Sequence, residues 1–187
     1  GAAGTGIIAW VNGGLTRQSM AEAILGTASA SAMIFFIVFG ASFYNSFLAL
    51  SQLPQVAAAY IAGSDYSPWL VLTAILILYL ALGCVMDSLS MILLTIPIFY
   101  PIIIGLDFGL PKEELAIWFG ILALIVVEVG LITPPVGMNL FVINSMAKSP
   151  ISHTYRGVIP FVISDIIRTA ILTMFPTISL FLIRWMY

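Results

Sequence analysis

The sequence predicts an all-α membrane protein, a multi-span helical bundle with one re-entrant helical hairpin and one discontinuous helix. Three observations predict this fold. Of the 187 residues, 61% are hydrophobic and 7% are charged, whereas ordinary globular domains carry about 25% charged residues. The apolar residues form runs as long as the roughly 20 residues of a spanning helix. Two of these runs are too long for one crossing, and each is interrupted near its middle.

Composition also excludes several classes of protein. The net charge is −2, and the six Lys and Arg residues are scattered rather than gathered into a basic patch. We therefore expect a lipid bilayer, and no nucleic acid, as a partner. Cys84 is the only cysteine, which leaves no disulfide framework and no thiolate metal site within the chain. We expect Cys84 to pack as a small apolar residue.

The first 68 residues divide into two segments. Residues 1–13 are apolar but too few to cross a membrane, so we interpret them as the remnant of a truncated transmembrane helix. Residues 14–68 hold a full span at about 21–50, followed by a connection in which 55–62 form a short interfacial helix.

Residues 69–147 contain both interrupted runs. The first run, 69–104, has a single charge, Asp87, and the polar stretch GCVMDSLS at 83–90 divides it into two arms. Two arms of similar length around a polar tip predict either a re-entrant hairpin or two short spans. The two prolines of the second arm would kink it.

Asp87 is the main candidate for function in this hairpin. A charged side chain at mid-bilayer costs about 2.5 to 3.5 kcal/mol on insertion scales. The hydroxyls of Ser88 and Ser90 are further oxygen ligands beside it. The alternative is structural: the turn reaches the interface, and Asp87 only caps the returning helix.

The second interruption, GLITPPVG at residues 130–137, predicts a broken helix over 114–147. Two adjacent prolines remove two amide donors and bias the residue before them away from helical geometry. Irregular backbone at membrane depth is tolerated only inside protein or along a wet cavity. Released carbonyls suit a cation, and the N-terminus of a half-helix suits an anion. A proline kink in a purely structural helix is the alternative.

The last segment, 148–187, is predicted to be a polar loop over 148–156 followed by a span at about 158–182. Counting crossings places the basic residues Arg17, Lys148 and Arg156, with His153, on one face of the membrane. The mostly acidic connections fall on the other face. The positive-inside rule assigns the basic face to the cytoplasm.

Three charged residues lie inside the later spans, and the role of the first, Glu128, has two interpretations. Glu128 lies two residues before the break, where it would bind a proton or pair with Arg168. Asp165 and Arg168 are spaced i, i+3, which favours a pair on one helix face.

Three stretches together resemble the large membrane subunit of tripartite ATP-independent periplasmic (TRAP) transporters. They are GCVMDSLSMILLTIPIFYPI (83–102), GLDFGLP (105–111) and VEVGLITPPVGMNLFV (127–142). The closing segment, 159–182, also fits, so the resemblance covers nearly the whole chain. Because the family's large subunit is longer, this chain resembles its C-terminal half.

The resemblance implies sodium-coupled secondary transport, not an enzyme. The chain would be one repeat of an inverted-repeat elevator transporter in the bacterial inner membrane, with 69–104 as hairpin and 114–147 as broken helix. A periplasmic solute-binding protein would deliver a small organic acid, such as a dicarboxylate, a sialic acid or a 2-oxo acid. The other implied partners are a small membrane subunit and the missing N-terminal half of the same subunit.

The resemblance further implies where a Na⁺ ion and the substrate would bind. The implied ion ligands are Asp87, Ser88 and Ser90 at the hairpin tip and Gly130, Thr133, Pro134, Val136 and Gly137 in the unwound loop. The implied substrate-binding residues are Thr133, Pro134, Pro135 and Asn139.

Two other classes of function stay open. An aspartyl intramembrane hydrolase needs two facing acids, for which Asp87 could pair with Asp165 or Glu128. A serine hydrolase needs a histidine at membrane depth, whereas the only histidine, His153, lies in a predicted loop. In a passive structural subunit, neither interrupted run would matter.

Overall fold

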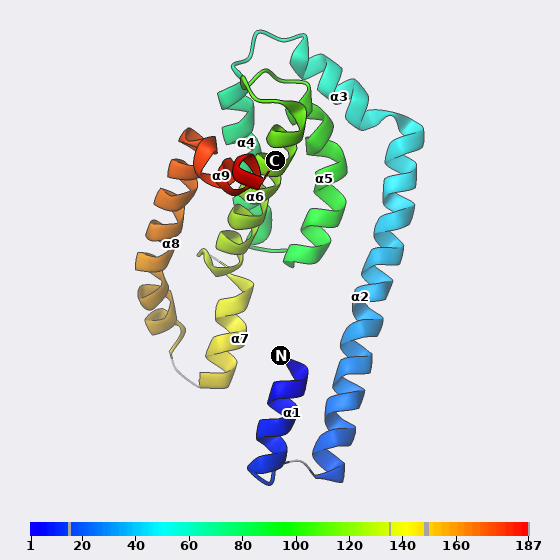
Figure 1. Ribbon diagram of the computed structural model, residues 1–187, viewed down its shortest axis with the longest axis vertical. Helices are drawn as coiled ribbons and strands as arrows, with labels where there is room; N and C mark the ends of the chain where they lie inside the picture. The colour runs from blue at the N-terminus through cyan, green and yellow to red at the C-terminus, as the bar shows by residue number, and fades with distance from the viewer. Residues whose placement is uncertain (15, 135, 148–149, 187) are drawn as a thin grey trace. The chain divides into compact units, whose positions relative to one another are not determined.

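The computed structural model describes residues 1–14, 16–134, 136–147 and 150–186. This described part consists of helices joined by short connections, in agreement with the composition (Figure 1). The helices fall into two compact units, Gly1–Ser42 and Phe43–Tyr187. The boundary between them lies inside a helix.

The first unit contains α1 (Ala2–Val11) and the first part of α2 (Arg17–Ser51). Helix α2 begins four residues before the predicted span at 21–50 and has 35 residues. At about 1.5 Å per residue it is roughly 50 Å long, more than the ~30 Å of a bilayer core. Most side chains of residues 1–42 are exposed, as expected of apolar helices that lipid surrounds.

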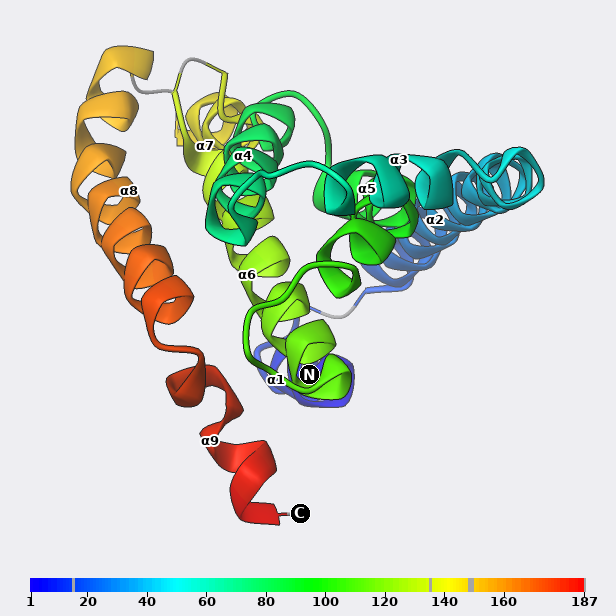
Figure 2. The same cartoon turned by 90° about the horizontal axis from the view of Figure 1, so that it is seen from above.

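The second unit is built around α6 (Lys112–Ile132), which packs against five other helices. Figure 2 shows α8 and α9 on one side of α6, and α5 and α3 on the other. The other helices are α3 (Leu53–Ala62), α4 (Pro68–Gly83), α5 (Ser88–Ile104), α7 (Met138–Ala147), α8 (Ile151–Met174) and α9 (Pro176–Met186).

The core of this unit lies between α4, α5 and α6. Its one buried polar side chain among the described residues, Thr95, is paired: Oγ1 donates to the Met91 carbonyl at 2.6 Å and is hydrogen-bonded to the Tyr79 hydroxyl at 2.9 Å. Such pairing is needed because lipid offers no partner for a polar group. The largest fully buried side chains are those of Leu72, Tyr79, Met91, Ile103, Leu115, Trp118, Phe119, Leu122 and Leu180.

Two prolines each deprive a carbonyl of its helical donor, and in both places a side chain of another helix supplies one. Pro97 lacks the amide that would bond to the Leu93 carbonyl, and Asn45 Nδ2 from α2 donates to that oxygen at 3.5 Å. Pro176 likewise leaves the carbonyl of Leu172 free. The indole Nε1 of Trp118 donates to it at 2.9 Å.

The C-terminal segment differs from the predicted loop and single span. Helix α8 already begins at Ile151, so His153 and Arg156 lie in a helix rather than in a loop. The span then ends at Met174 and a separate helix begins at Pro176, because proline biases Phe175 away from helical geometry (φ −124°, ψ 74°).

Three described helices, α2, α6 and α8, are long and apolar enough to cross a membrane. Helices α4 and α5 have 16 and 17 residues, fewer than the about 20 of a full span. Only residues 84–87 connect them, which agrees with a hairpin; its re-entrance into the membrane stays a prediction.

Candidate functional site

The helix is interrupted where the double proline predicts. Helix α6 ends at Ile132 and α7 begins at Met138. Thr133 has extended backbone (φ −87°, ψ 129°), and Gly137 has a φ of +60°, a conformation that favours glycine. Pro135, a predicted substrate-binding residue, lies outside the described residues.

The α4–α5 turn contains Asp87, which is the N-cap of α5. Its Oδ2 accepts a hydrogen bond from the Ser90 amide at 2.9 Å, so the predicted capping role of Asp87 is confirmed. Ser88 begins α5 and is half-buried. The ion-binding role of these three residues stays a prediction.

The break and the turn are joined by a close contact between two glycines. A Cβ added to Gly130 in α6 would lie 2.7 Å from Cα of Gly83 in α4, so neither position has room for a side chain. One residue later, the thiol of Cys84 donates to the carbonyls of Leu80 at 3.3 Å and Thr133 at 3.6 Å. The buried Cys84 packs as predicted. Gly83 and Cys84 thus contact the broken helix.

This contact brings the ends of four helices into one region. Helices α4 and α6 end there, while α5 and α7 begin a few residues further along the chain. Carbonyls at helix C-termini carry partial negative charge and favour cations, whereas amides at N-termini favour anions. The region therefore has groups suited to both a cation and a carboxylate.

Besides the Thr133 carbonyl, which accepts from Cys84, four carbonyls of the break region already have donors. Thr133 supplies two of these, its Oγ1 to Val129 at 2.6 Å and its amide to Gly130 at 3.1 Å. Gly137 accepts from the Leu140 amide at 2.8 Å, and Val136 accepts from the Tyr155 hydroxyl of α8 at 3.1 Å. Among the described residues, no donor is present for the carbonyls of Leu131, Ile132 and Pro134. These three are free to bind a ligand.

Other predicted residues lie on the helices that flank the break or on α8. Asn139 is in the first turn of α7 and is exposed. Glu128 is exposed on α6. Arg168 Nη2 lies 2.9 Å from Asp165 Oδ1, which confirms the pair on one helix face; the alternative pairing of Arg168 with Glu128 is wrong. The hydrolase hypothesis nominated Asp87 and Asp165, and in the structure Asp87 caps α5 while Asp165 is paired with Arg168 on α8.

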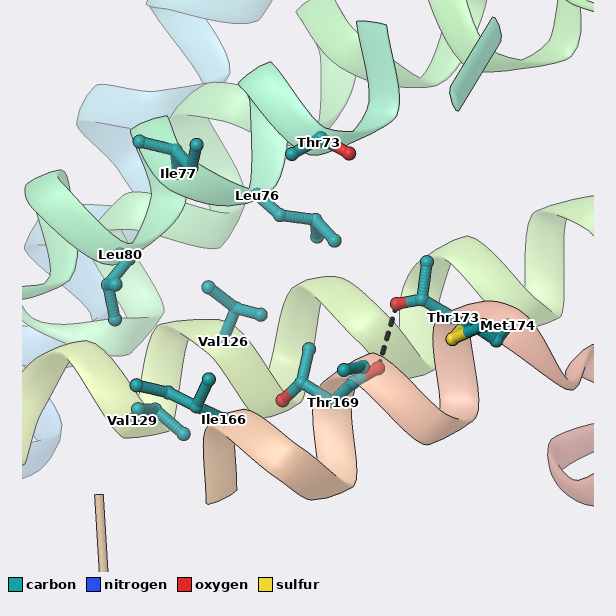
Figure 3. A pocket seen from close by; sticks show the side chains of 11 residues that line it. Thr73, Leu76, Ile77, Leu80, Val126, Val129, Ile166, Thr169, Thr173 and Met174 are labelled. Atoms are coloured by element: carbon teal, nitrogen blue, oxygen red, sulfur yellow. Dashed lines mark hydrogen bonds between the residues drawn. The ribbon is translucent and has the colours of Figure 1, made fainter. Parts of the chain in front are cut away.

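A pocket of about 320 Å³ lies elsewhere, between α4, α6 and α8 (Figure 3). Its lining is apolar apart from three threonines. Each hydroxyl donates within its own helix: Thr73 to Trp69, Thr169 to Asp165 and Thr173 to Thr169, at 2.7 to 2.8 Å. Because it offers no free donor to a carboxylate, we do not place the substrate there.

The described residues contain no group of three or more His, Cys, Asp or Glu side chains that could hold a metal ion. A cation at the break would therefore depend mainly on backbone and hydroxyl oxygens, which are suitable ligands for hard cations.

Comparison with known proteins gives one family model and several relatives that match most of the chain. A family model described as the DctM component of the tripartite ATP-independent periplasmic transporter matches residues 2–178. The C4-dicarboxylate TRAP transporter large permease protein DctM of Pseudomonas aeruginosa is 32% identical over 165 residues, 88% of this chain and 37% of that protein. The sialic acid TRAP transporter large permease protein SiaM of Vibrio cholerae is 31% identical over 170 residues, 90% of this chain and 38% of that protein.

A third relative has a different substrate in its name. The 2,3-diketo-L-gulonate TRAP transporter large permease protein YiaN of Escherichia coli is 26% identical over 173 residues, 91% of this chain and 39% of that protein. The chain thus matches 37 to 39% of the length of these three relatives, less than the predicted half. Its position within the large subunit stays a prediction.

Proposed function

The chain belongs to the DctM component family of tripartite ATP-independent periplasmic transporters, and we propose that it is part of a large permease subunit that moves a small organic acid across the bacterial inner membrane. We propose further that sodium drives this transport and that the hairpin α4–α5 and the broken helix α6–α7 move together in an elevator mechanism. The chain is a multi-pass integral membrane protein, as its family and its apolar helices indicate.

The observation that supports this function best is the meeting of the two interruptions. A helix broken at membrane depth exposes carbonyls that lipid cannot satisfy. Here the break lies directly against the α4–α5 turn, with Cys84 contacting Thr133. We propose that sodium binds to free carbonyls of the break and to oxygens of the turn. The candidate ligands are the predicted set at Asp87, Ser88, Ser90, Gly130, Thr133, Pro134, Val136 and Gly137. Of its break residues, Pro134 has the carbonyl without a donor among the described residues, and the carbonyls of the other four would bind sodium beside the hydrogen bonds they already accept.

The names of three relatives support a carboxylate as the substrate, whereas a fourth is named for isethionate, which carries a sulfonate. A C4-dicarboxylate, a sialic acid and 2,3-diketo-L-gulonate differ in size but all carry a carboxylate. The amides at the start of α7 suit such a group. We propose that Thr133, Pro134, Pro135 and Asn139 contribute to this side of the site. A periplasmic solute-binding protein and a small membrane subunit are the proposed partners.

Uptake by the complete transporter tests the proposal. The large subunit that contains this chain, with its partners, is reconstituted in vesicles, and uptake of the acid carried by its binding protein is measured against sodium concentration. We expect Thr133→Ala and Asp87→Ala to reduce sodium-dependent uptake at normal expression, because each change removes an oxygen and a hydrogen bond at the junction of turn and break.

Two matched variants control for local destabilisation. Thr73→Val removes a hydroxyl that bonds within its helix as that of Thr133 does, but in the apolar pocket. Asp107→Asn alters a carboxylate that accepts from the Gly109 amide at 2.9 Å in an exposed connection. Both should keep sodium-dependent uptake. Unchanged uptake and unchanged sodium dependence in the Thr133 and Asp87 variants would contradict the proposed ion site.

A further inference from the structure

Tyr155 contacts the broken helix from outside the predicted site. It lies near the start of α8, and its hydroxyl donates to the Val136 carbonyl at 3.1 Å. The side chain is half-buried. Among the described residues of the break, Val136 is the one whose carbonyl is bonded to α8.

The loop at the break is thus held from two sides by different helices. On one side the Thr133 carbonyl accepts from the thiol of Cys84, in the α4–α5 turn. On the other side the Val136 carbonyl accepts from Tyr155. A thiol is a weak donor and its distance is 3.6 Å, so the hydroxyl at 3.1 Å is the stronger of the two.

We propose that Tyr155 is a positioning residue for the break. Its hydroxyl fixes the Val136 peptide, and the loop can then keep the Thr133 carbonyl directed at the α4–α5 turn and the Pro134 carbonyl unpaired. The inference rests on the proposed function in one respect: if sodium binds to these carbonyls, Tyr155 presets their arrangement. Preset oxygens bind a cation more tightly than oxygens that must first be ordered.

Cys84 allows the positioning role to be measured without transport. Its thiol is buried and contacts the loop, so it reacts with a maleimide only when turn and loop separate. In the full-length subunit within its complex, Tyr155→Phe should raise the alkylation rate of Cys84 about two- to tenfold, the factor expected from losing one hydrogen bond. Mass spectrometry of the peptide that contains Cys84 gives the rate.

Two controls separate local from general loosening. Tyr60→Phe removes the hydroxyl of an exposed tyrosine on α3 and should leave the rate unchanged. Ala123→Cys places a thiol in the buried core of α6, 1% exposed, and reports global opening. Faster reaction at Cys84 but not at position 123 supports the proposal. An unchanged rate at Cys84, or an equal rise at both positions, overturns it.

The sodium dependence of uptake is the second measurement. Tyr155→Phe should raise the half-saturating sodium concentration about two- to tenfold, again the factor for one hydrogen bond, and a saturating sodium concentration should restore the rate of uptake. If the half-saturating concentration equals that of the unaltered protein, the proposal that Tyr155 presets the carbonyls is overturned. If uptake by the unaltered protein ignores sodium but Tyr155→Phe still exposes Cys84, the sodium proposal fails and the positioning role stands.

Discussion

Two glycines, Gly83 and Gly130, determine how closely the α4–α5 turn approaches the break between α6 and α7. Any side chain at Gly130 would meet the main chain of Gly83, since an added Cβ would lie 2.7 Å from its Cα. Main-chain atoms cannot move aside as a flexible side chain can. The helices would have to separate, and Cys84 would lose its contact with Thr133.

Gly130→Ala should therefore destabilise the protein by about 1 to 3 kcal/mol, the usual cost of overpacking. Gly120→Ala in the same helix is the matched control, because nothing lies within 4 Å of a Cβ added there. That variant should be neutral or stabilising by up to ~1 kcal/mol, since alanine favours helix. Thermal unfolding of the purified subunit in detergent measures both; equal melting temperatures would show that the contact is not tight.

Trp118 should be sensitive to loss of its indole N–H. Trp118→Phe keeps a buried ring but leaves the Leu172 carbonyl without a donor, so we expect a loss of about 1 to 3 kcal/mol. Trp69→Phe, in the neighbouring ring that packs edge-to-face on Trp118 at 6.1 Å and is 46% exposed, should lose less. Chemical unfolding followed by circular dichroism compares the two variants, and an equal or smaller effect at position 118 would contradict the prediction.

At the residue scale, the sequence predicts what depends on local chemistry. The capping role of Asp87 follows from its position before a helix, and the burial of Cys84 follows from its apolar neighbours. The partners of Asn45, Trp118 and Tyr155 could not be predicted, because each bonds to a carbonyl 19 to 54 residues away along the chain. The signal available beforehand was a proline four residues after two of these carbonyls.

At the scale of helices, an ion pair fastens α9 to α6. Arg184 holds Glu114 with two donors, Nη2 at 2.5 Å and Nε at 3.2 Å. The link lies one helical turn from Trp118, which bonds to the end of α8. Helix α6 is thus tied to both sides of the α8–α9 joint.

Reversing one charge of this pair should loosen the C-terminal helix. We expect Glu114→Lys to lower the melting temperature slightly, because the pair is exposed and screened by salt. The second change Arg184→Glu should restore it by re-forming the pair in the opposite sense. Melting curves at low and high ionic strength measure the effect. No recovery in the double variant would show that the pair adds nothing to the attachment of α9.

Most helices could be predicted from apolar runs and prolines, but the C-terminal ones less well. The break after Ile132 follows from two prolines, which no continuous helix accommodates. The end of α8 at Met174 depends on Pro176 alone, and a single proline either kinks or ends a helix. Tertiary bonding decides between these outcomes, here through the Trp118 bond to Leu172.

At the scale of the whole chain, α6 and α7 together form one predicted crossing of the membrane, which would separate the connection before α6 from the start of α8. Asp107 precedes α6, and His153 follows α7 near the start of α8. We expect an impermeant maleimide to label Asp107→Cys and His153→Cys from opposite faces of the membrane, measured in vesicles of both orientations. Labelling from the same face would mean that α6 and α7 return to the side from which they started.

The break and the turn could be predicted more completely in their location than in their contacts; whether they bind an ion stays a prediction. The residue types at the two interruptions identify them as unusual at membrane depth, because lipid satisfies neither a carboxylate nor a free carbonyl. Which atoms meet depends on how α4 crosses α6. The helices cross closely there because Gly83 and Gly130 have no side chains, and this crossing brings Cys84 at the start of the turn against Thr133 of the break.

A side chain between two helices can change its rotamer and thereby absorb a small relative shift. The crossing of α4 and α6 contains no such side chain, since both residues at the contact are glycines. A displacement of one helix toward the other therefore moves the main chain of the second helix directly. We therefore expect the two interruptions, which are 43 residues apart in the sequence from Asp87 to Gly130, to move together rather than independently.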